Sequence, residues 1–265
     1  MLEERQIKSL HIEALTREEL AGEEHEPHVL HQTSTIAALL DGAYEGDLTL
    51  GELLEEGDLG LGTTNGLDGE LIVLDGECFR ATIDGSVERL GPEVKTPFAV
   101  VASFQPTAER PLEGPLDFDQ MTAEIDSLRP SEMPSCAVRV DGRFAAIRAR
   151  SVPRQDPPYR PLPEIIDEQR IFDLADTEGT LIGFRFPDYA DGIEVGGWHL
   201  HYIDQERKVG GHVIELELLE GTAQMDPSNE LHAEMPPGVD LGAVAVDRGI
   251  SDQIAAVERT PETGA

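Results

Sequence analysis

The chain has 265 residues, of which 53 are acidic and 20 basic, so its formal net charge is −33 at neutral pH. This balance leaves no basic stripe to neutralise nucleic-acid phosphates, and no apolar run approaches the roughly 20 residues that a membrane-spanning helix needs. Two cysteines, Cys78 and Cys136, are too few for a disulfide framework and the first residues lack the pattern of a secretion signal, so we expect a cytoplasmic protein.

The acidic surplus predicts a salt-adapted protein. Only three of the basic residues are lysines, namely Lys8, Lys95 and Lys208. In dilute buffer, repulsion among the carboxylates would destabilise the compact state, whereas molar salt shortens the Debye length to about 3 Å. The alternative is an acidic, partly disordered chain, but the acids are spread between apolar runs. We therefore expect a salt-rich cytoplasm, such as that of a halophile.

Residues 1–30 are polar and acidic, and predict an N-terminal extension that is either mobile or a short surface helix. A metal-binding role for His25, His28 and His31 is an open alternative. It is the weaker one, because no strand or helix pattern holds these side chains rigidly.

Two short helices are predicted after this extension. Thr33 or Ser34 is expected to cap the first, which Gly42 ends. Thr49 and Glu52 have the spacing of a capping box and predict the start of the second.

A glycine-rich stretch, residues 58–69, leads into an apolar strand at residues 71–74. Its backbone can approach a ligand closely, but the Lys-Ser/Thr ending of a phosphate-binding loop is absent. Thr63 lies within this stretch. Glu70 stands just before the strand, where its carboxylate either lies on the surface or points into a cleft.

The middle of the chain predicts a meander of short strands over residues 78–104, followed by a helix over residues 117–129. Residues 153–163 carry several prolines and exclude regular structure, so they are the best candidate for a crossing between subdomains.

Residues 137–150 predict a hairpin that turns at Asp141-Gly142. Arg148 and Arg150 lie on one face of its second strand. They either pair with the abundant carboxylates, or one of them binds an anionic substrate through both guanidinium nitrogens.

Strand patterns recur at residues 179–184 and 213–219, and a last short helix is expected at residues 251–258. Several adjacent antiparallel strands predict a small barrel or a strongly curved sheet in the C-terminal half.

Between those two strand patterns lies a hairpin that carries three histidines. His199 and His201 project from the same face of one strand, and the polar loop 204–208 brings the returning strand with His212 back beside them. Three imidazoles that converge in this way leave an open position on a metal ion, which is typical of a catalytic site. The alternative is a pair of edge-strand histidines and an unrelated third.

Taken together, the motifs resemble the acetolactate decarboxylases. The resemblance runs from about residue 31 to residue 225, with weaker agreement in the tail, and rests on these segments in order: Gln32-Thr33-Ser34-Thr35-Ile36, Gly60-Leu61-Gly62-Thr63, Leu67-Asp68-Gly69-Glu70-Leu71-Ile72, Arg150-Ser151-Val152-Pro153, Gly183-Phe184, Tyr189-Ala190-Asp191-Gly192-Ile193, Gly197-Trp198-His199-Leu200-His201-Tyr202 and Gly210-Gly211-His212-Val213.

The resemblance implies one zinc ion per chain, held by His199, His201 and His212, and conversion of 2-acetolactate to acetoin and carbon dioxide by a homodimer without an organic cofactor. It also implies active-site roles for further residues: Glu70, Arg150, the neighbouring Thr63 and a glutamate of the C-terminal tail, for which Glu258 is the best match.

The fold that the resemblance implies is α/β (α+β), with two parts after the extension. Residues 31–165 would form an N-terminal mixed α/β part on a large sheet. Residues 166–265 would form a small antiparallel β-barrel that carries the zinc site and the tail.

The chemistry explains these residue types. Loss of carbon dioxide from acetolactate leaves an enediolate, which zinc would stabilise as a Lewis acid. Our hypothesis is that Arg150 positions the anionic end of the substrate, while Glu70, with Glu258, transfers the proton that completes acetoin.

Two other functions remain as alternatives. His199, His201 and Glu206 nearly fit the first motif of a cupin-type metal-dependent dioxygenase or isomerase, although that fold needs its third histidine in a separate, later motif. The second alternative is a non-enzymatic, salt-adapted binding protein whose histidines are structural.

Overall fold

The computed structural model describes residues 10–15, 27–131 and 133–234. In this part of the chain the strands are β1 (His11–Leu15), β2 (Val29–Thr33), β3 (Leu48–Thr49), β4 (Leu59–Thr63), β5 (Glu70–Leu74), β6 (Glu77–Ala81), β7 (Val87–Arg89), β8 (Lys95–Thr96), β9 (Phe98–Ala102), β10 (Ala108–Asp117), β11 (Ser135–Ser151), β12 (Arg170–Phe186), β13 (Gly197–Asp204), β14 (Gly210–Ser228) and β15 (Glu230–Glu234). The helices are α2 (Ile36–Leu40), α3 (Leu50–Glu56), α4 (Phe118–Asp126), α5 (Leu162–Ile165) and two 3-10 turns, η1 (Ile166–Glu168) and η2 (Asp188–Ala190).

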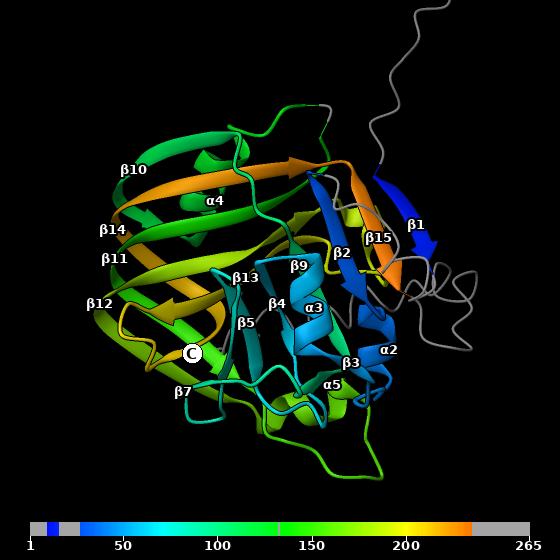
Figure 1. Cartoon of the computed structure of the whole chain (residues 1–265). Helices are drawn as coiled ribbons and strands as arrows, with labels where there is room; N and C mark the ends of the chain where they lie inside the picture. The colour runs from blue at the N-terminus through cyan, green and yellow to red at the C-terminus, as the bar shows by residue number, and fades with distance from the viewer. Residues whose placement is uncertain (1–9, 16–26, 132, 235–265) are drawn as a thin grey trace, which may run out of the picture.

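Two sheets form the body of the molecule (Figure 1). The first has eight strands in the order β1-β15-β2-β9-β4-β5-β6-β7, and β15 is parallel to both of its neighbours while the other pairs are antiparallel. The second has the order β10-β14-β11-β12-β13 and is antiparallel throughout. Its long strands curve side by side, and β13 pairs back onto β14.

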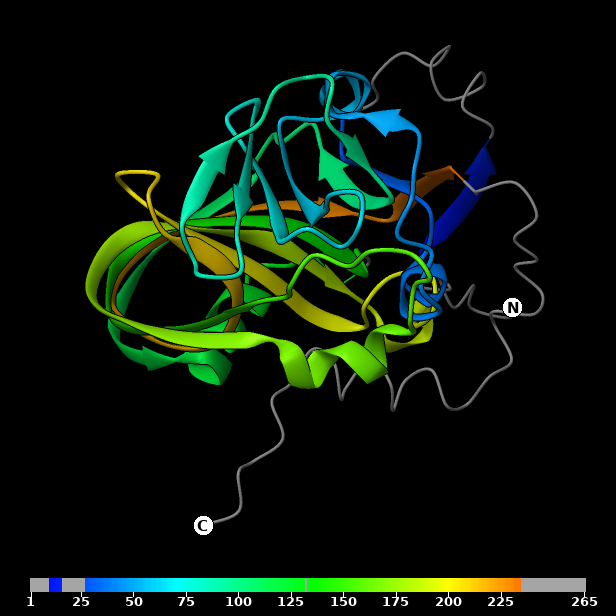
Figure 2. The same ribbon diagram turned by 90° about the horizontal axis from the view of Figure 1, so that it is seen from below.

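The sheets pack face to face, as the view in Figure 2 shows. The central strands β4, β5 and β9 of the first sheet are buried on both faces, which explains the unbroken apolar run Leu71-Ile72-Val73-Leu74. Ile72 and Leu74 join the core shared with Phe184 of the second sheet. Leu71 and Val73 face the opposite way, toward helix α3. Helix α4 covers the inner face of the curved second sheet through Met121 and Ile125.

The helix predictions for the described residues are largely confirmed, and the helix expected at residues 251–258 lies outside them. Helix α3 begins with the expected capping box between Thr49 and Glu52 and ends at Gly57. Helix α4 is shorter than predicted and is capped by Asp117. The cap of α2 was wrongly predicted: Thr35 accepts from the Ala38 amide. Thr33 instead ends strand β2, and Ser34 has a φ of 64°.

The predicted hairpin at Asp141-Gly142 is wrong. Strand β11 runs without a turn from Ser135 to Ser151, and Gly142 pairs with Gly179 on β12 and Gly221 on β14. A Cβ on Gly142 would lie 2.6 Å from the Glu220 carbonyl oxygen. The glycine therefore permits a close approach of strands where the sheet bends, and the Asp-Gly pair does not signal a turn here.

The C-terminal barrel is not confirmed. The second sheet takes β10 and β11 from the N-terminal half of the chain, and the first sheet takes β15 from the C-terminal end. The fold is mostly strand with a few short helices, so the α/β (α+β) class is right only in that helices accompany a large mixed sheet. The division into residues 31–165 and 166–265 stays a prediction.

The N-terminal extension contains order that was not predicted. His11–Leu15 forms strand β1, which pairs in parallel with β15, so the mobile or helical interpretation is wrong for these five residues. Cys78 and Cys136 are both buried and free. Burial raises the pKa of each thiol to about 12. No helix formed by the described residues has the length and apolarity needed to cross a bilayer.

Candidate metal centre

The three predicted histidines meet in the interior of the protein. His199 and His201 project from one face of β13, and His201 stands directly opposite His212 on β14. Their ring centroids lie 5.0 to 5.5 Å apart. Each ring offers a nitrogen, and these three nitrogens lie within 4.8 Å of one another, so the group has the dimensions to hold a metal ion. The hairpin prediction is confirmed.

The orientation of His201 is fixed by the first sheet. Its Nδ1–H donates to the Leu71 carbonyl oxygen of β5 over 2.8 Å, which directs Nε2 toward the other two rings. Nε2 is buried and has no hydrogen-bond partner within the described residues. Burial, and next the neighbouring His199, lower the pKa of His201 well below its usual value. The ring is therefore neutral and keeps a lone pair on Nε2, as a metal ligand requires.

Glu70 and Arg150 are brought to the same place from opposite sheets. Glu70 begins β5, and Arg150 on β11 stands opposite His212. The Arg150 guanidinium Nη1 donates to Glu70 Oε1 at 3.3 Å, and the other oxygen, Oε2, lies 3.6 Å from His201 Nε2. Both side chains are buried. Of the two positions that the sequence left open for Glu70, the structure shows the buried one, beside the histidines.

Thr63 supports the glutamate from the neighbouring strand. It pairs with Glu70 in the β4–β5 ladder, and its hydroxyl donates to the Gly69 carbonyl oxygen over 2.8 Å. Gly69 has a φ of +80°, and a Cβ there would lie 2.4 Å from the Ala81 carbonyl oxygen. Only glycine fits this tight approach, which accounts for the glycine just before Glu70.

A cavity opens between these groups. Its polar side is formed by Thr63, Glu70, Arg150, His199 and His212. Its other side is apolar and consists of Ile36, Leu39, Gly62, Leu67, Phe98, Val152 and Leu162. A small, mostly buried cavity with a few convergent polar groups on one wall is the usual form of a site for a small organic molecule.

One site residue was missed by sequence reasoning. Glu194 lies in the loop before β13 and is completely buried, and its Oε1 lies 3.6 Å from His199 Nδ1. It has no periodic pattern around it. The available signal was a lone acid between apolar residues, Ile193 and Val195, shortly before the histidine strand.

Four other residues either lie outside the described part of the chain or do not line the cavity. Glu258 lies outside the described residues. Trp198 and Tyr202 flank the histidines in sequence but contribute to the core of the second sheet. The Tyr202 hydroxyl is hydrogen-bonded to Thr177 at 2.7 Å. Arg148 is half-exposed and lies near surface carboxylates, so only Arg150 of the two arginines reaches the site.

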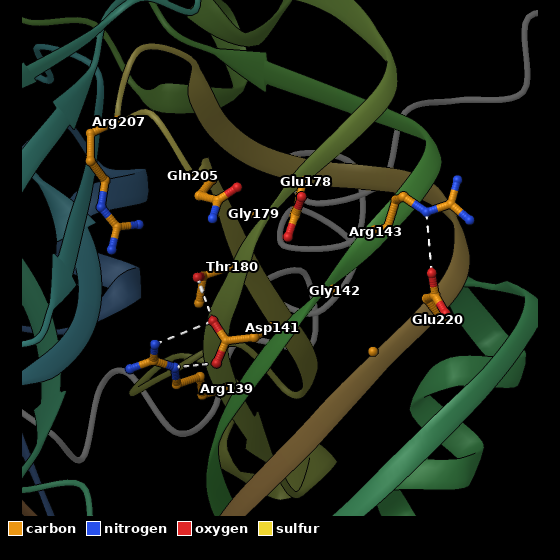
Figure 3. A pocket seen from close by; sticks show the side chains of 11 residues that line it. Arg139, Asp141, Gly142, Arg143, Glu178, Gly179, Thr180, Gln205, Arg207 and Glu220 are labelled. Carbon is orange, nitrogen blue, oxygen red and sulfur yellow. Dashed lines mark hydrogen bonds and ion pairs between the residues drawn. The ribbon is translucent and has the colours of Figure 1, made fainter.

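A larger and more open hollow lies on the second sheet (Figure 3), and none of the residues that line it also lines the histidine cavity. It exists where Gly142, Gly179 and Gly221 place no side chains on three neighbouring strands. Its arginines face carboxylates: Arg139 donates to Asp141 at 2.7 Å, and Arg143 to Glu220 at 3.3 Å. The hollow is explained by the bend of the sheet, and the small histidine cavity is the candidate site.

Comparisons with known proteins identify relatives of the chain. The sequence profile of the family described as alpha-acetolactate decarboxylase matches residues 30–245. The alpha-acetolactate decarboxylase of Methylococcus capsulatus is 44% identical over 212 residues, which cover 80% of this chain and 82% of that protein. The enzyme of Klebsiella aerogenes is 42% identical over the same shares of both chains. The crystal structure of alpha-acetolactate decarboxylase from Bacillus subtilis superposes with a TM-score of 0.82 at 35% identity, covering 88% of this chain and all of that one (100%).

Proposed function

The chain belongs to the alpha-acetolactate decarboxylase family, and we propose that it converts 2-acetolactate to acetoin and carbon dioxide with one zinc ion held by His199, His201 and His212. Decarboxylation of acetolactate follows from membership of the family. The zinc ion and the roles of individual residues are our proposal. The observation that carries it is the buried histidine group beside an arginine and a glutamate.

The donor set fits zinc. Three neutral imidazole nitrogens are the ligand set of many catalytic zinc sites, in which a fourth position stays open for water or substrate. The buried Nε2 of His201, which has no hydrogen-bond partner within the described residues, is directed toward that centre. When bound there, zinc would supply a Lewis acid that draws electron density from the substrate's ketone oxygen.

Arg150 is proposed to bind the substrate's carboxylate. Decarboxylation breaks a carbon–carbon bond, and the electron pair of that bond stays on the carbon that carried the carboxylate. A buried guanidinium holds the leaving carboxylate in one orientation with paired hydrogen bonds. Its contact with Glu70 fixes it from the other side.

Glu70 is proposed to move the proton. The enediolate left by decarboxylation must gain a proton on carbon to become acetoin, and one carboxyl group held against one face sets the configuration of the product. Glu70 is fixed by Arg150 and by the turn at Gly69. Glu258 of the tail is proposed as its second carboxylate on the strength of the family resemblance.

The apolar wall of the cavity is proposed to pack against the methyl groups of 2-acetolactate. Ile36, Leu39 and Phe98 supply this wall. By covering the reacting carbons they exclude water, which strengthens the electrostatic contacts of Arg150.

The cupin alternative is not favoured. Glu206, which that reading needs as a ligand, lies in the exposed loop between β13 and β14 and forms an ion pair with Lys208. We expect elemental analysis to find one zinc per chain both in the wild type and in Glu206→Ala. Loss of metal from Glu206→Ala would support the cupin reading.

Salt adaptation is a further proposal, supported by the net charge of −33. Because the carboxylates repel one another in dilute buffer, the midpoint of thermal unfolding is expected to rise by about 10 °C or more between 0.1 M and 2 M KCl. The location consistent with this is a salt-rich cytoplasm. A midpoint that is unchanged or falls over this range would contradict the proposal.

A homodimer is proposed from the family resemblance. Sedimentation velocity at high salt is expected to give twice the chain mass of 28.9 kDa. A single species at the chain mass would contradict it.

A further inference from the structure

We infer that Glu194 is a positioning residue for the metal ligand His199. Its carboxylate faces Nδ1 of the ring, so that the proton stays on Nδ1 and Nε2 is presented to the metal. This inference rests on the proposed zinc site and adds a residue to it that touches neither the metal nor the substrate.

The position of Glu194 places it behind the histidine. Its Oε1 lies 3.6 Å from His199 Nδ1, and the side chain is completely buried (0% exposed). Glu194 does not line the cavity. The three ligand nitrogens of His199, His201 and His212 lie within 4.8 Å of one another, and Glu194 is not part of that group. In the proposed arrangement the carboxylate stands behind the ring, because it contacts Nδ1 and does not line the cavity.

The distance defines the kind of contact. At 3.6 Å the pair is about half an ångström longer than an ordinary N–H···O hydrogen bond. In this structure the contact is therefore electrostatic. It becomes a hydrogen bond if the ring and the carboxylate approach by that amount. A metal on Nε2 makes Nδ1–H a stronger donor, which favours this approach.

The loop that carries Glu194 is held by hydrogen bonds from helix α2 and strand β2. The Ile36 and Ala37 amides at the start of α2 donate to the carbonyl oxygens of Ile193 and Gly192, at 3.0 and 3.1 Å. The Gln32 side-chain amide donates to the Ile193 oxygen as well, at 2.8 Å. The carbonyl beside Glu194 thus has two donors, so the carboxylate is held on a fixed backbone.

The loop is also closed on itself. The Glu194 amide donates to the Ala190 oxygen at 3.1 Å, and the Gly196 amide to the Asp191 carboxylate at 2.8 Å. The same helix α2 provides Ile36 and Leu39 to the cavity wall. Helix α2 therefore both lines the cavity and forms hydrogen bonds with the loop that carries Glu194.

A second proposed metal ligand, His201, also has a hydrogen-bond acceptor at its Nδ1. His201 donates its Nδ1–H to the Leu71 carbonyl oxygen, which leaves Nε2 toward the centre. Glu194 gives His199 the corresponding acceptor, with a full negative charge. A carboxylate in this place raises the basicity of the ring and fixes its tautomer, and the loss of such a partner typically weakens metal binding by about 10- to 100-fold.

The test is the zinc affinity of two variants, measured by competition with a chromophoric chelator on the full chain at high salt. Glu194→Leu removes the acceptor, and a 10- to 100-fold weaker affinity is expected. Glu194→Gln keeps an oxygen but loses the charge, and an intermediate loss of about 10-fold is expected. At saturating zinc, kcat of the folded variants should return to within a fewfold of wild type, because Glu194 does not touch the substrate.

The control is Glu56→Gln, which alters a carboxylate 3.4 Å from His31 Nδ1, away from the site. Its zinc affinity should equal that of wild type. Affinities of both Glu194 variants within threefold of wild type would overturn the inference. If Glu194→Leu does not fold, the zinc affinity of Glu194→Gln alone is compared with that of wild type, and a value within threefold overturns the inference. A wild type that binds no zinc would instead overturn the proposed function, so the two failures are distinguishable.

Discussion

Replacing His201 with alanine is expected to remove stoichiometric zinc and to lower kcat/KM for 2-acetolactate about a thousandfold, or about 4 kcal/mol of transition-state stabilisation. His201 is the most deeply buried of the three histidines, and its Nε2 has no hydrogen-bond partner within the described residues. Two remaining imidazoles do not complete a catalytic zinc site. Elemental analysis and steady-state acetoin formation measure the two effects.

His11→Ala is the matched control for this variant. His11 lies on strand β1 with its side chain 67% exposed, where it faces Glu230, and it does not line the cavity. The control should keep one zinc and wild-type activity. If His201→Ala were folded and retained both zinc and activity, the assignment of the three histidines as ligands would be wrong. Circular dichroism of the variant separates loss of metal from loss of fold.

The second large effect is expected from Glu70→Gln. The amide keeps the shape of the side chain and an oxygen for Arg150, but it cannot take up and release a proton. General acid–base catalysis contributes about 10²- to 10⁴-fold, so kcat should fall within that range while zinc stays bound. Glu70 lies 3.3 Å from Arg150 and 3.6 Å from His201, within reach of a substrate held between them.

Glu88→Gln provides the comparison, because Glu88 forms an ion pair with Arg80 at 2.7 Å on the surface of the first sheet. That change should leave kcat unaltered. Near-full activity of Glu70→Gln with zinc still bound would rule out the acid–base role. The contact with Arg150 would then be a purely structural ion pair.

Local sequence patterns predicted the parts of the site that depend on short-range geometry. The spacing of His199 and His201 places both rings on one face of a strand, and the polar loop returns His212 beside them, so the hairpin followed from periodicity alone. The capping box of Thr49 and Glu52 also follows from local chemistry.

The errors arose where distant strands decide the outcome. Asp141-Gly142 has the composition of a hairpin turn, yet two neighbouring strands pair with it and keep it extended. Strand β1 has no recognisable strand pattern and forms because β15, from the other end of the described chain, offers it an edge. Residues that pair across such separations leave no local signal.

The same reasoning explains Glu194. Its role depends on a loop fastened to helix α2, and the bonds from the Ile36 and Ala37 amides join residues more than 150 positions apart in the sequence. The meeting of Glu70 and Arg150 is similar, because each comes from a different sheet. The resemblance to a family indicated that pair, whereas composition and periodicity left the position of Glu70 open.

The most direct test of the account is acetoin formation from racemic 2-acetolactate at high salt, with zinc-loaded, chelator-treated and zinc-restored protein compared side by side. The zinc-loaded protein is expected to form acetoin and an equal amount of carbon dioxide, to lose this activity after chelation and to regain it when zinc is added. No acetoin from the zinc-loaded protein, or an unchanged rate after complete removal of the metal, would contradict it.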